Sequence, residues 1–136
     1  MVTIRPAEIA DVPAVLGLWH LSGAEPTRTD DPDSLARLIE HDARAMWLAE
    51  SDDRLVGTVI AGWDGWRGSV YRLVVAPDHR RRGLGRRLLA QAEHRLSEHG
   101  ARRSQAIVVE SDRRAASFWR TSGWEEQVER LRFVKG

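Results

Sequence analysis

Apolar residues along the chain recur with two spacings, one helical and one typical of strands. Leu84, Leu88, Ala92 and Leu96 lie four residues apart and predict one face of a helix. Shorter runs rich in β-branched residues, such as RLVGTVIAGW, predict strands. The runs follow one another as strand, helix, helix, three strands, helix, strand, helix and one or two final strands. We expect these elements at residues 2–6, 9–21, 34–41, 46–51, 54–63, 69–75, 84–99, 105–110, 113–122 and 124–134.

Capping residues mark where the predicted helices begin. Asp33 or Ser34 is expected to cap the helix that ends at His41, and Ser111 or Asp112 is expected to cap the last helix. Repeats, linkers and low-complexity tracts are absent, and 136 residues suit one domain. The order of elements therefore predicts a single α/β domain, residues 1–136, with a mixed, mostly antiparallel sheet of about seven strands and about four helices.

Charge and composition narrow the chemistry of such a domain. Its 21 basic residues, of which Lys135 is the only lysine, nearly balance 20 acidic ones, and this balance argues against a general binder of nucleic acid. The absence of cysteine excludes disulfides, thiolate metal sites and a cysteine nucleophile, and the five histidines show no metal-binding spacing. Signal-peptide layout and bilayer-spanning apolar runs are absent, so we expect a cytoplasmic protein without a membrane partner.

The stretch from Val74 to Leu89, VVAPDHRRRGLGRRLL, joins a predicted strand to a predicted helix. Gly83 and Gly85 at the helix start leave room for backbone N–H groups to face a ligand at the positive end of the helix dipole. Such a site suits phosphate oxygens, whereas the alternative is a plain turn with solvated arginines. The P-loop and the dinucleotide fingerprint do not match, so the remaining pattern is R-x-x-G-x-G, from Arg80 to Gly85.

Four ordered motifs resemble the GCN5-related N-acetyltransferase (GNAT) family, whose acetyl-CoA pyrophosphate loop carries R-x-x-G-x-G. They are IRPAEIADVPAV, YRLVVAPDHRRRGLGRRLL, the strand AIVVES and the helix DRRAASFWRTSGW, and the resemblance covers residues 3–134. AGWDGWRGSVY is also similar, more faintly, to the hairpin of the YpeA-type bacterial acetyltransferases. The resemblance implies an acetyl-CoA-dependent N-acetyltransferase that uses acetyl-CoA as co-substrate and needs no metal. It also implies a sheet whose fourth and fifth strands splay apart.

The same resemblance implies where coenzyme A binds. The backbones of Leu73 and Val75 would pair with pantetheine like an added strand, and an N–H near Leu73 would polarise the thioester carbonyl. Backbone amides from Arg81 to Arg86 would hold the pyrophosphate, with guanidinium groups adding charge nearby. The full set of implied cofactor-binding residues is Leu73, Val74, Val75, Arg80, Arg81, Arg82, Gly83, Leu84, Gly85, Arg86, Asp112 and Trp119.

Two positions depart from the family pattern. Asp112 stands where the family has an asparagine that often bonds pantetheine, and aspartate can cap a helix but cannot donate an amide N–H. Trp119 stands where the family often has a tyrosine proposed to protonate the departing thiolate, and an indole does not titrate as an acid in this range. Water or another group could supply that proton. The thiolate could also leave unprotonated, since a thiol pKa of about 8.5 makes it only modestly unfavourable at neutral pH.

Tyr71 and Glu110 are the candidate catalytic residues. Tyr71, the one tyrosine, lies two residues before Leu73 and, by strand alternation, on the same face. There it could touch the acceptor, act as the acid or pack against a helix. The general base stays open between Glu110, Asp64, Glu25 and a water relay.

Candidate acceptor-binding residues lie on the hairpin that enters the fourth strand. Trp63, Asp64, Trp66 and Arg67 could shape the acceptor's entrance, or they could simply pack the hairpin, with Arg67 paired to Asp64. Glu25 lies on the loop that lines the acceptor side in the family. The acidic residues of this loop could attract a cationic amine or act as solvated helix caps: Glu25, Asp30, Asp31 and Asp33.

Three functions are compatible with these residues. The first is acetyl transfer to a primary amine of a small molecule, peptide or protein by direct attack in a ternary complex, since no cysteine can carry the acyl group. The second is a non-catalytic acyl-CoA-binding module, suggested by Trp119 and the missing obvious base. The third is a nucleic-acid binder using HRRRGLGRR, which the balanced charge argues against. Family members often dimerise, so a homodimer is left open.

Overall fold

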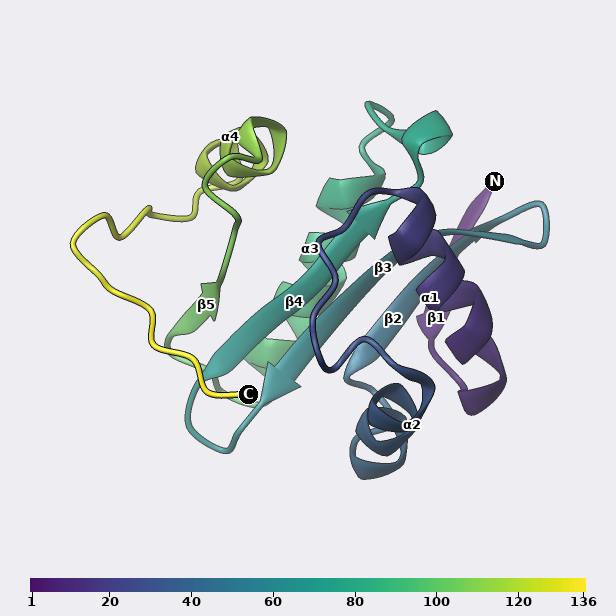
Figure 1. Ribbon diagram of the computed structural model, residues 1–136, viewed down its shortest axis with the longest axis horizontal. Helices are drawn as coiled ribbons and strands as arrows, with labels where there is room; N and C mark the ends of the chain where they lie inside the picture. Colours follow the sequence, from purple (N-terminus) through teal and green to yellow (C-terminus); the bar gives the residue numbers. More distant parts are fainter. The chain divides into compact units, whose positions relative to one another are not determined.

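The computed structural model describes all of residues 1–136 and divides the chain into two compact units, Met1–Ala106 and Ile107–Gly136. The first unit contains five strands and three α-helices, and the second contains one α-helix (Figure 1). In chain order the elements are β1 (Val2–Pro6), α1 (Val12–Leu21), α2 (Pro32–His41), β2 (Met46–Ser51), β3 (Arg54–Trp63), β4 (Gly68–Val75), α3 (Leu84–Glu98), β5 (Ser104–Ala106) and α4 (Arg113–Thr121). The expected order of elements is confirmed as far as this last helix.

The five strands form one sheet in the order β1-β2-β3-β4-β5. Pairs among the first four strands are antiparallel, and β4 and β5 are parallel, so the sheet is mixed as expected. A parallel pair needs a crossover connection, which α3 supplies. β5 pairs only with Gly68, Ser69 and Val70, the first residues of β4. The rest of β4, from Tyr71 to Val75, therefore has no partner strand in β5.

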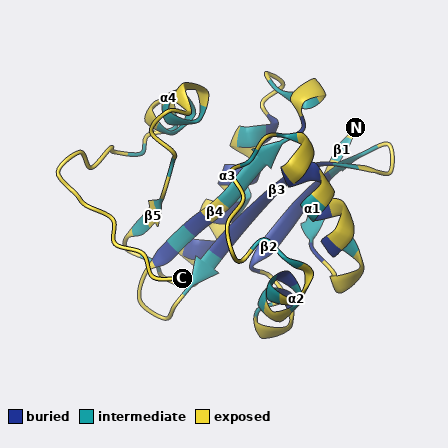
Figure 2. Cartoon of the chain, in the orientation of Figure 1, coloured by how far each residue is buried: buried dark blue, intermediate teal, exposed yellow.

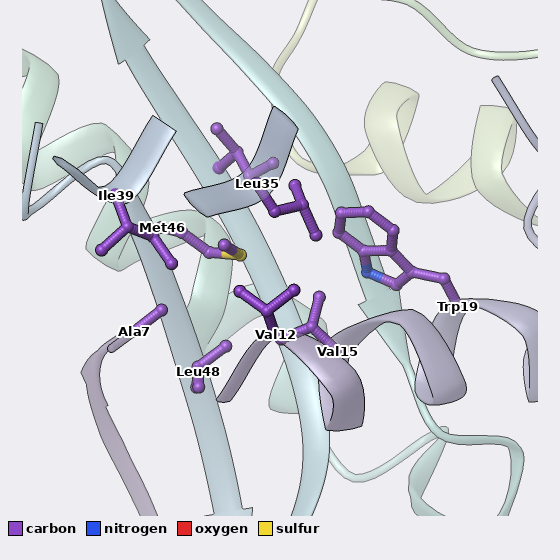
Figure 3. Close-up of a cluster of buried hydrophobic side chains, with 9 residues drawn as sticks. Ala7, Val12, Val15, Trp19, Leu35, Ile39, Met46 and Leu48 are labelled. Carbon is purple, nitrogen blue, oxygen red and sulfur yellow. The ribbon is translucent and has the colours of Figure 1, made fainter. Parts of the chain in front are cut away.

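Helices cover both faces of the sheet. Figure 1 shows α1 and α2 in front of the sheet and α3 behind it, and Figure 2 shows that buried residues concentrate in the central strands. On α1, Val12, Val15 and Trp19 recur at helical spacing and turn one face toward the sheet. Together with residues of α2 and the strands they form one buried cluster, shown in part in Figure 3: Ala7, Val12, Val15, Trp19, Leu35, Ile39, Met46, Leu48 and Ile60.

Two glycines allow close contacts on the α3 side of the first unit. A Cβ atom on Gly57 of β3 would lie 2.8 Å from Leu88 Cδ1, closer than a real Cβ contact. A Cβ atom on Gly68 would lie 2.5 Å from Ser104 Oγ and 2.7 Å from Leu96 Cδ1. The predicted apolar face of this helix is buried as expected, and glycine is what allows the sheet to approach it.

The second helix begins earlier than the sequence indicates. Its N-cap is Asp31, not Asp33 or Ser34, because the Asp31 carboxylate accepts the backbone N–H of Ser34 at 2.7 Å. Pro32 then occupies the first helical position, where its missing N–H and fixed φ cost nothing. The predicted end at His41 is confirmed.

The sheet has five strands rather than the seven expected, and both differences lie near the C-terminus. The strand expected at 105–110 is only Ser104–Ala106, and the segment 124–134 contains no strand. In that segment Val128, Leu131 and Phe133 are exposed and do not alternate regularly with polar residues. A strand is stable only beside a partner, and the second unit holds no other strand, so β-propensity alone is not enough.

The second unit is organised around α4. The carboxylate of Asp112 accepts the backbone N–H of Ala115 at 3.0 Å, which confirms the predicted cap. Trp119 packs edge-on against Trp124, with ring centroids 4.7 Å apart. Gly123 follows the helix with a φ of 87°, a left-handed conformation that suits glycine after a helix end.

Candidate functional site

The ladder between β3 and β4 is interrupted where β4 loses its other neighbour. Thr58 pairs with Val74 and Ile60 pairs with Tyr71, so two residues of β4 lie opposite the single residue Val59. This arrangement is a β-bulge, which bends a strand and redirects its backbone groups. The bulge lies in the part of β4 that β5 leaves unpaired.

Arg72 occupies the bulge with a φ of 49°, a left-handed conformation that is uncommon for a residue with a side chain. The extra residue breaks the alternation of side chains along β4. Spacing alone therefore cannot put Tyr71 and Leu73 on one face, and the expectation that they share a face loses its basis.

A buried chain of hydrogen bonds holds the bulge. Trp19 Nε1 donates to Thr58 Oγ1 at 2.9 Å, and Thr58 Oγ1 donates to the carbonyl oxygen of Arg72 at 2.9 Å. Thr58 is fully buried, and leaving such a polar group without a partner would cost roughly 1–3 kcal/mol. The hydroxyl thus replaces a ladder bond that the bulge removes.

The side chain of Arg72 leaves the strand and reaches the loop between α1 and α2. Its guanidinium forms an ion pair with Asp30 and donates to the carbonyl oxygen of Glu25 at 2.7 Å. The loop that the family resemblance assigns to the acceptor side is thereby attached to the bulge of β4.

The connection from β4 to α3 turns through two left-handed residues, Arg81 with a φ of 64° and Gly83 with a φ of 76°. The first backbone bond of α3 joins the N–H of Arg87 to the carbonyl oxygen of Gly83 at 3.1 Å. The N–H groups of Leu84 and Gly85 precede that bond and have no partner within the helix. A left-handed residue before a right-handed helix turns successive N–H groups to one side, an arrangement suited to anions.

Positive charge surrounds this helix start. Arg81, Arg82 and Arg86 are exposed, whereas Arg80 is half-buried and donates to the carbonyl oxygen of Ser22 at 3.4 Å. The neighbouring carboxylate, Asp78, is already paired with Arg54, so it does not offset this charge.

Asp78 accepts from Arg54 at 2.7 Å and lies 2.9 Å from the His79 ring. The Arg54 guanidinium, followed by the His79 contact, holds the pKa of Asp78 well below its usual range. The carboxylate is therefore ionised at neutral pH and bound to side chains of its own surroundings.

A hollow of about 240 Å³ lies beside Tyr71. It brings together Tyr71 with three of the predicted acceptor residues, Trp63, Asp64 and Arg67. Tyr71 is 50% exposed and makes no hydrogen bond through its hydroxyl. The rest of the lining comes from α2 and the adjoining strands: Leu38, His41, Asp42, Ala45, Gly62 and Ser69.

Asp64 is a turn residue. Its Oδ1 accepts the backbone N–H groups of Arg67 at 2.7 Å and Trp66 at 2.8 Å. These N–H bonds, that of Arg67 first, hold the pKa of Asp64 below its ordinary value, which makes it a weak base at neutral pH. Arg67 thus pairs with Asp64 through its backbone, while its guanidinium carbon lies 4.0 Å from the Trp66 ring centroid.

Trp66 does not line the hollow beside Tyr71. It is 70% exposed and borders a second hollow of about 610 Å³ with Trp63, which stacks on His99 at 5.5 Å between ring centroids. The other residues of the second hollow are Gly65, Arg67, Gly100, Arg102 and Arg103. Of the predicted acceptor residues of the hairpin, Trp63 and Arg67 line both hollows, whereas Asp64 lines only the first and Trp66 only the second.

The remaining predicted site residues are placed as follows. Glu25 is exposed on its loop and contributes only its carbonyl oxygen to the contacts described. Glu110, Asp112 and Trp119 belong to the second unit, where Glu110 is exposed, Asp112 caps α4 and Trp119 packs on Trp124. No group of three or more His, Asp or Glu side chains is arranged to hold a metal ion. None of the helices combines the length and apolarity needed to span a bilayer.

Sequence reasoning missed the residues that organise the bulge. No role at the site was predicted for Trp19, Thr58, Arg72 or the Asp30 ion pair. A polar residue inside each of two apolar runs, Thr58 in VGTVIAG and Arg72 in VYRLVV, was the available signal. A polar residue in such a position needs a specific partner once it is buried.

The chain is similar to known proteins both in sequence and in structure. A family model described as the acetyltransferase (GNAT) family matches residues 15–124. The chain is similar to the aminoglycoside N-acetyltransferase AAC(6')-Iy in complex with CoA, at 19% identity and a TM-score of 0.76, over 100% of this chain and 95% of that one. It is also similar to the PaiA N-acetyltransferase of Thermoplasma acidophilum in complex with coenzyme A, at 16% identity and a TM-score of 0.77, over 89% and 87% of the two chains. The ribosomal-protein-S18-alanine N-acetyltransferase of Escherichia coli gives 22% identity and a TM-score of 0.76, over 93% and 79%. At these identities the structures show a shared fold.

Proposed function

Because the chain belongs to the GNAT acetyltransferase family, whose model spans residues 15–124, we propose that it transfers an acetyl group from acetyl-CoA to a primary amine by direct attack in a ternary complex. One observation carries the proposal. The half of β4 that β5 leaves unpaired leads, through residues 76–83, to a helix start whose first N–H groups have no partner within the helix. A thioester chain lying along that half of β4 would bring its phosphates to the helix start.

The pyrophosphate of acetyl-CoA would bind the backbone N–H groups from Arg81 to Arg86. Glycine at position 83 has no atom within 4 Å of the place where a Cβ would stand, so a phosphate can approach the backbone closely. Exposed guanidinium groups at Arg81 and Arg82 add charge at short range. Two of the similar structures are complexes with CoA, which supports coenzyme A as the ligand.

The pantetheine arm would pair with the backbones of Leu73 and Val75. Beside it, the bulge at Arg72 turns backbone groups out of the regular ladder, which favours an N–H near Leu73 as donor to the thioester carbonyl. The amine nitrogen attacks the carbonyl carbon, so that a C–N bond forms while the oxygen becomes an oxyanion. Collapse of this intermediate breaks the C–S bond, and the electron pair leaves with the sulfur.

The acceptor would enter from the side of the hollow beside Tyr71. The Tyr71 ring and Trp63 provide apolar contacts there, and Asp64 provides an anion that is fixed by its turn. The lowered pKa of Asp64 disfavours it as the general base. Water, Glu25 and Glu110 stay as candidates for taking the proton that the ammonium must lose.

The acceptor class is either a small-molecule amine or a peptide amine. The similar structures include an aminoglycoside acetyltransferase and an enzyme acting on a protein's alanine. The acidic loop gives little support to a cationic acceptor, because Asp30 is paired with Arg72 and Asp31 caps α2. Similarity to YpeA-type enzymes, a single domain, a cytoplasmic location and a homodimer stay predictions.

A non-catalytic acyl-CoA-binding module is the second candidate. Trp119 favours it, because an indole at the family's tyrosine position cannot protonate a leaving thiolate. Both candidates require CoA binding, and only turnover separates them.

Isothermal titration with acetyl-CoA and CoA, followed by a thiol-release assay against a panel of amines, tests the proposal. We expect binding of both ligands and thiol release with one amine class. Binding without release on any amine would favour the non-catalytic module. Absence of binding would contradict both candidates and leave the family relationship as one of fold.

A further inference from the structure

We propose that Arg72 is a positioning residue that fixes the acceptor loop, residues 22–31, to the bulge of β4 and so sets where the amine stands relative to the thioester. The proposal rests on the acetyltransferase function proposed above. Arg72 is suited to this role because its backbone forms the bulge and its side chain holds the loop.

The contact between Arg72 and the loop is specific and largely shielded from water. The side chains of Arg72 and Asp30 are 18% and 15% exposed, and Nε lies 3.3 Å from Asp30 Oδ1 while Nη2 binds the other carboxylate oxygen. The same Nη2 donates to the carbonyl oxygen of Glu25 at 2.7 Å. Arg72 therefore binds the loop at two positions, Glu25 and Asp30, which are five residues apart.

Apart from the Arg72 contacts, the acceptor loop is held at its two ends, where Ser22 accepts from Arg80, Ala24 packs against the core cluster and Asp31 caps α2. None of its residues is buried, and residues 25–29 are all exposed. Its internal order depends on Asp30, which accepts the N–H of Thr27 at 2.9 Å and also binds Arg72. Figure 1 shows the loop crossing in front of β4 on its way from α1 to α2. Segments with few buried contacts open at low free-energy cost, so one ion pair can decide the loop's position.

Trp19 supports both the backbone carbonyl and the guanidinium group of Arg72. Its indole N–H supports the Arg72 carbonyl through Thr58, and its ring lies 5.2 Å from the guanidinium carbon. The backbone that would polarise the thioester and the side chain that holds the loop are thus fixed by one buried tryptophan. Displacement of the loop by as little as about 1 Å would misalign the amine, which is enough to slow a transfer reaction strongly.

The variant Arg72→Gly tests the role of the side chain separately from the role of the backbone. Glycine adopts a φ of 49° without strain, so the bulge is retained while the grip on the loop is lost. We expect the acceptor KM to rise about tenfold or more, with the acetyl-CoA Kd unchanged within about twofold. Arg72→Lys retains the charge but not the planar fork, and we expect it to recover part of the difference.

Thr58→Val disturbs the other half of the arrangement. It removes the hydroxyl that holds the Arg72 carbonyl and leaves the side-chain grip on Asp30 in place. We expect kcat to fall severalfold while the acceptor KM changes by less than about threefold, the opposite split from Arg72→Gly. Equal changes of KM and kcat in both variants would overturn the proposal, because they would indicate a general loss of structure.

Limited trypsin digestion tests the loop without any substrate. Arg28 is the only basic residue of the acceptor loop and is exposed, so cleavage after it reports opening of the loop. We expect Arg72→Gly and Asp30→Asn to speed this cleavage about tenfold, and the double variant to add little. Arg54→Ala, which breaks the Arg54–Asp78 pair instead, is the matched control and should leave cleavage at Arg28 unchanged.

Unchanged cleavage at Arg28 in Arg72→Gly would overturn the proposal even if the protein is an active acetyltransferase. Faster cleavage with an unchanged acceptor KM would overturn it as well, since the loop would then be anchored without serving the acceptor. The failure of the proposed function would appear separately, as absent thiol release or absent CoA binding in the wild-type protein.

Discussion

Two loops frame the proposed reaction, and they are built in opposite ways. In the phosphate loop, residues 76–83, the turn into α3 is shaped by its own backbone, with left-handed conformations at Arg81 and Gly83, and long-range side-chain contacts such as Arg54–Asp78 lie before that turn. The acceptor loop, residues 22–31, is held by Arg72, a side chain 42 residues away from its partner Asp30. The first arrangement is local in sequence and the second is not.

Because of this difference, the two loops differ in which of their properties can change easily during evolution. A loop shaped by its backbone binds the invariant part of the reaction, the phosphates, through N–H groups that every residue carries. A loop held by a side chain can change its position when one distant residue changes. The acceptor loop is therefore the region where specificity can be altered without changing the cofactor site.

The comparison of the two loops is tested most directly at Gly23 and Gly83, because one lies in each loop with almost the same conformation. Their φ angles are 74° and 76°, and a Cβ on either would meet no atom within 4 Å. Alanine at either position costs roughly 1–2 kcal/mol of backbone strain. We expect Gly83→Ala to weaken the acetyl-CoA Kd about tenfold in isothermal titration, and Gly23→Ala to leave it within about twofold. Equal effects would mean that the phosphate loop has no special relation to the cofactor.

Charge in the two loops gives a smaller difference. Arg82 and Arg28 are both exposed, and replacing either by glutamine removes one positive charge. We expect Arg82→Gln to weaken acetyl-CoA binding about threefold at low salt, and the effect to fade at high salt because exposed charges are screened. Arg28→Gln is the matched control and should not change the Kd. A salt-independent loss in Arg82→Gln would contradict an electrostatic role.

Tyr71 tests the side of β4 that faces the acceptor. Its ring lines the hollow and its hydroxyl makes no hydrogen bond, so phenylalanine preserves the contact surface. We expect Tyr71→Phe to change the acceptor KM by about twofold and to leave kcat unchanged in steady-state kinetics. A fall in kcat of tenfold or more would instead identify the hydroxyl as the acid that protonates the thiolate.

Two carboxylates beside the loops give the smallest expected effect, on stability against acid. The backbone N–H of Ser34 lowers the pKa of Asp31, and the Arg54 guanidinium lowers the pKa of Asp78. Both folded-state values lie below the ordinary value of about 3.9, so each group contributes stability above that pH and loses it as the pH falls through the folded value.

We expect Asp31→Asn and Asp78→Asn each to show a smaller loss of Tm between about pH 5 and about pH 2 than the wild-type protein. Salt should reduce the contribution of Asp78, an exposed ion pair, more than that of Asp31, which is bound by the backbone. Acid curves that coincide with the wild type would show that neither contact affects stability.

Much of the fold was predictable because its signals are local. The period of Leu84, Leu88, Ala92 and Leu96 marks α3, and the glycines before it mark the phosphate loop. The bulge at Arg72 was not predictable, because it depends on the register of β4 against β3 and on the buried hydroxyl of Thr58. The one or two strands expected at 124–134 were predicted wrongly, because β-propensity contains no information about whether a partner strand is available.

In the candidate site, too, the residues with local sequence signals were predictable and those with long-range contacts were not. Gly83 and the arginines around it were identified from a short motif, whereas the pairing of Arg72 with Asp30 joins segments that are distant in sequence. Asp64 shows the intermediate case: its turn was recognised, but its lowered pKa depends on which N–H groups its carboxylate accepts.

The short pairing of β5 with β4 has a consequence for handling the protein. Residues Tyr71–Val75 present a strand edge to which β5 adds no hydrogen bonds, and such an edge can pair with the edge of another molecule and start aggregation. A ligand that lies along the edge would cover it in the manner of a missing strand. Preparations kept in excess acetyl-CoA should therefore remain dispersed at concentrations and temperatures at which the ligand-free protein precipitates.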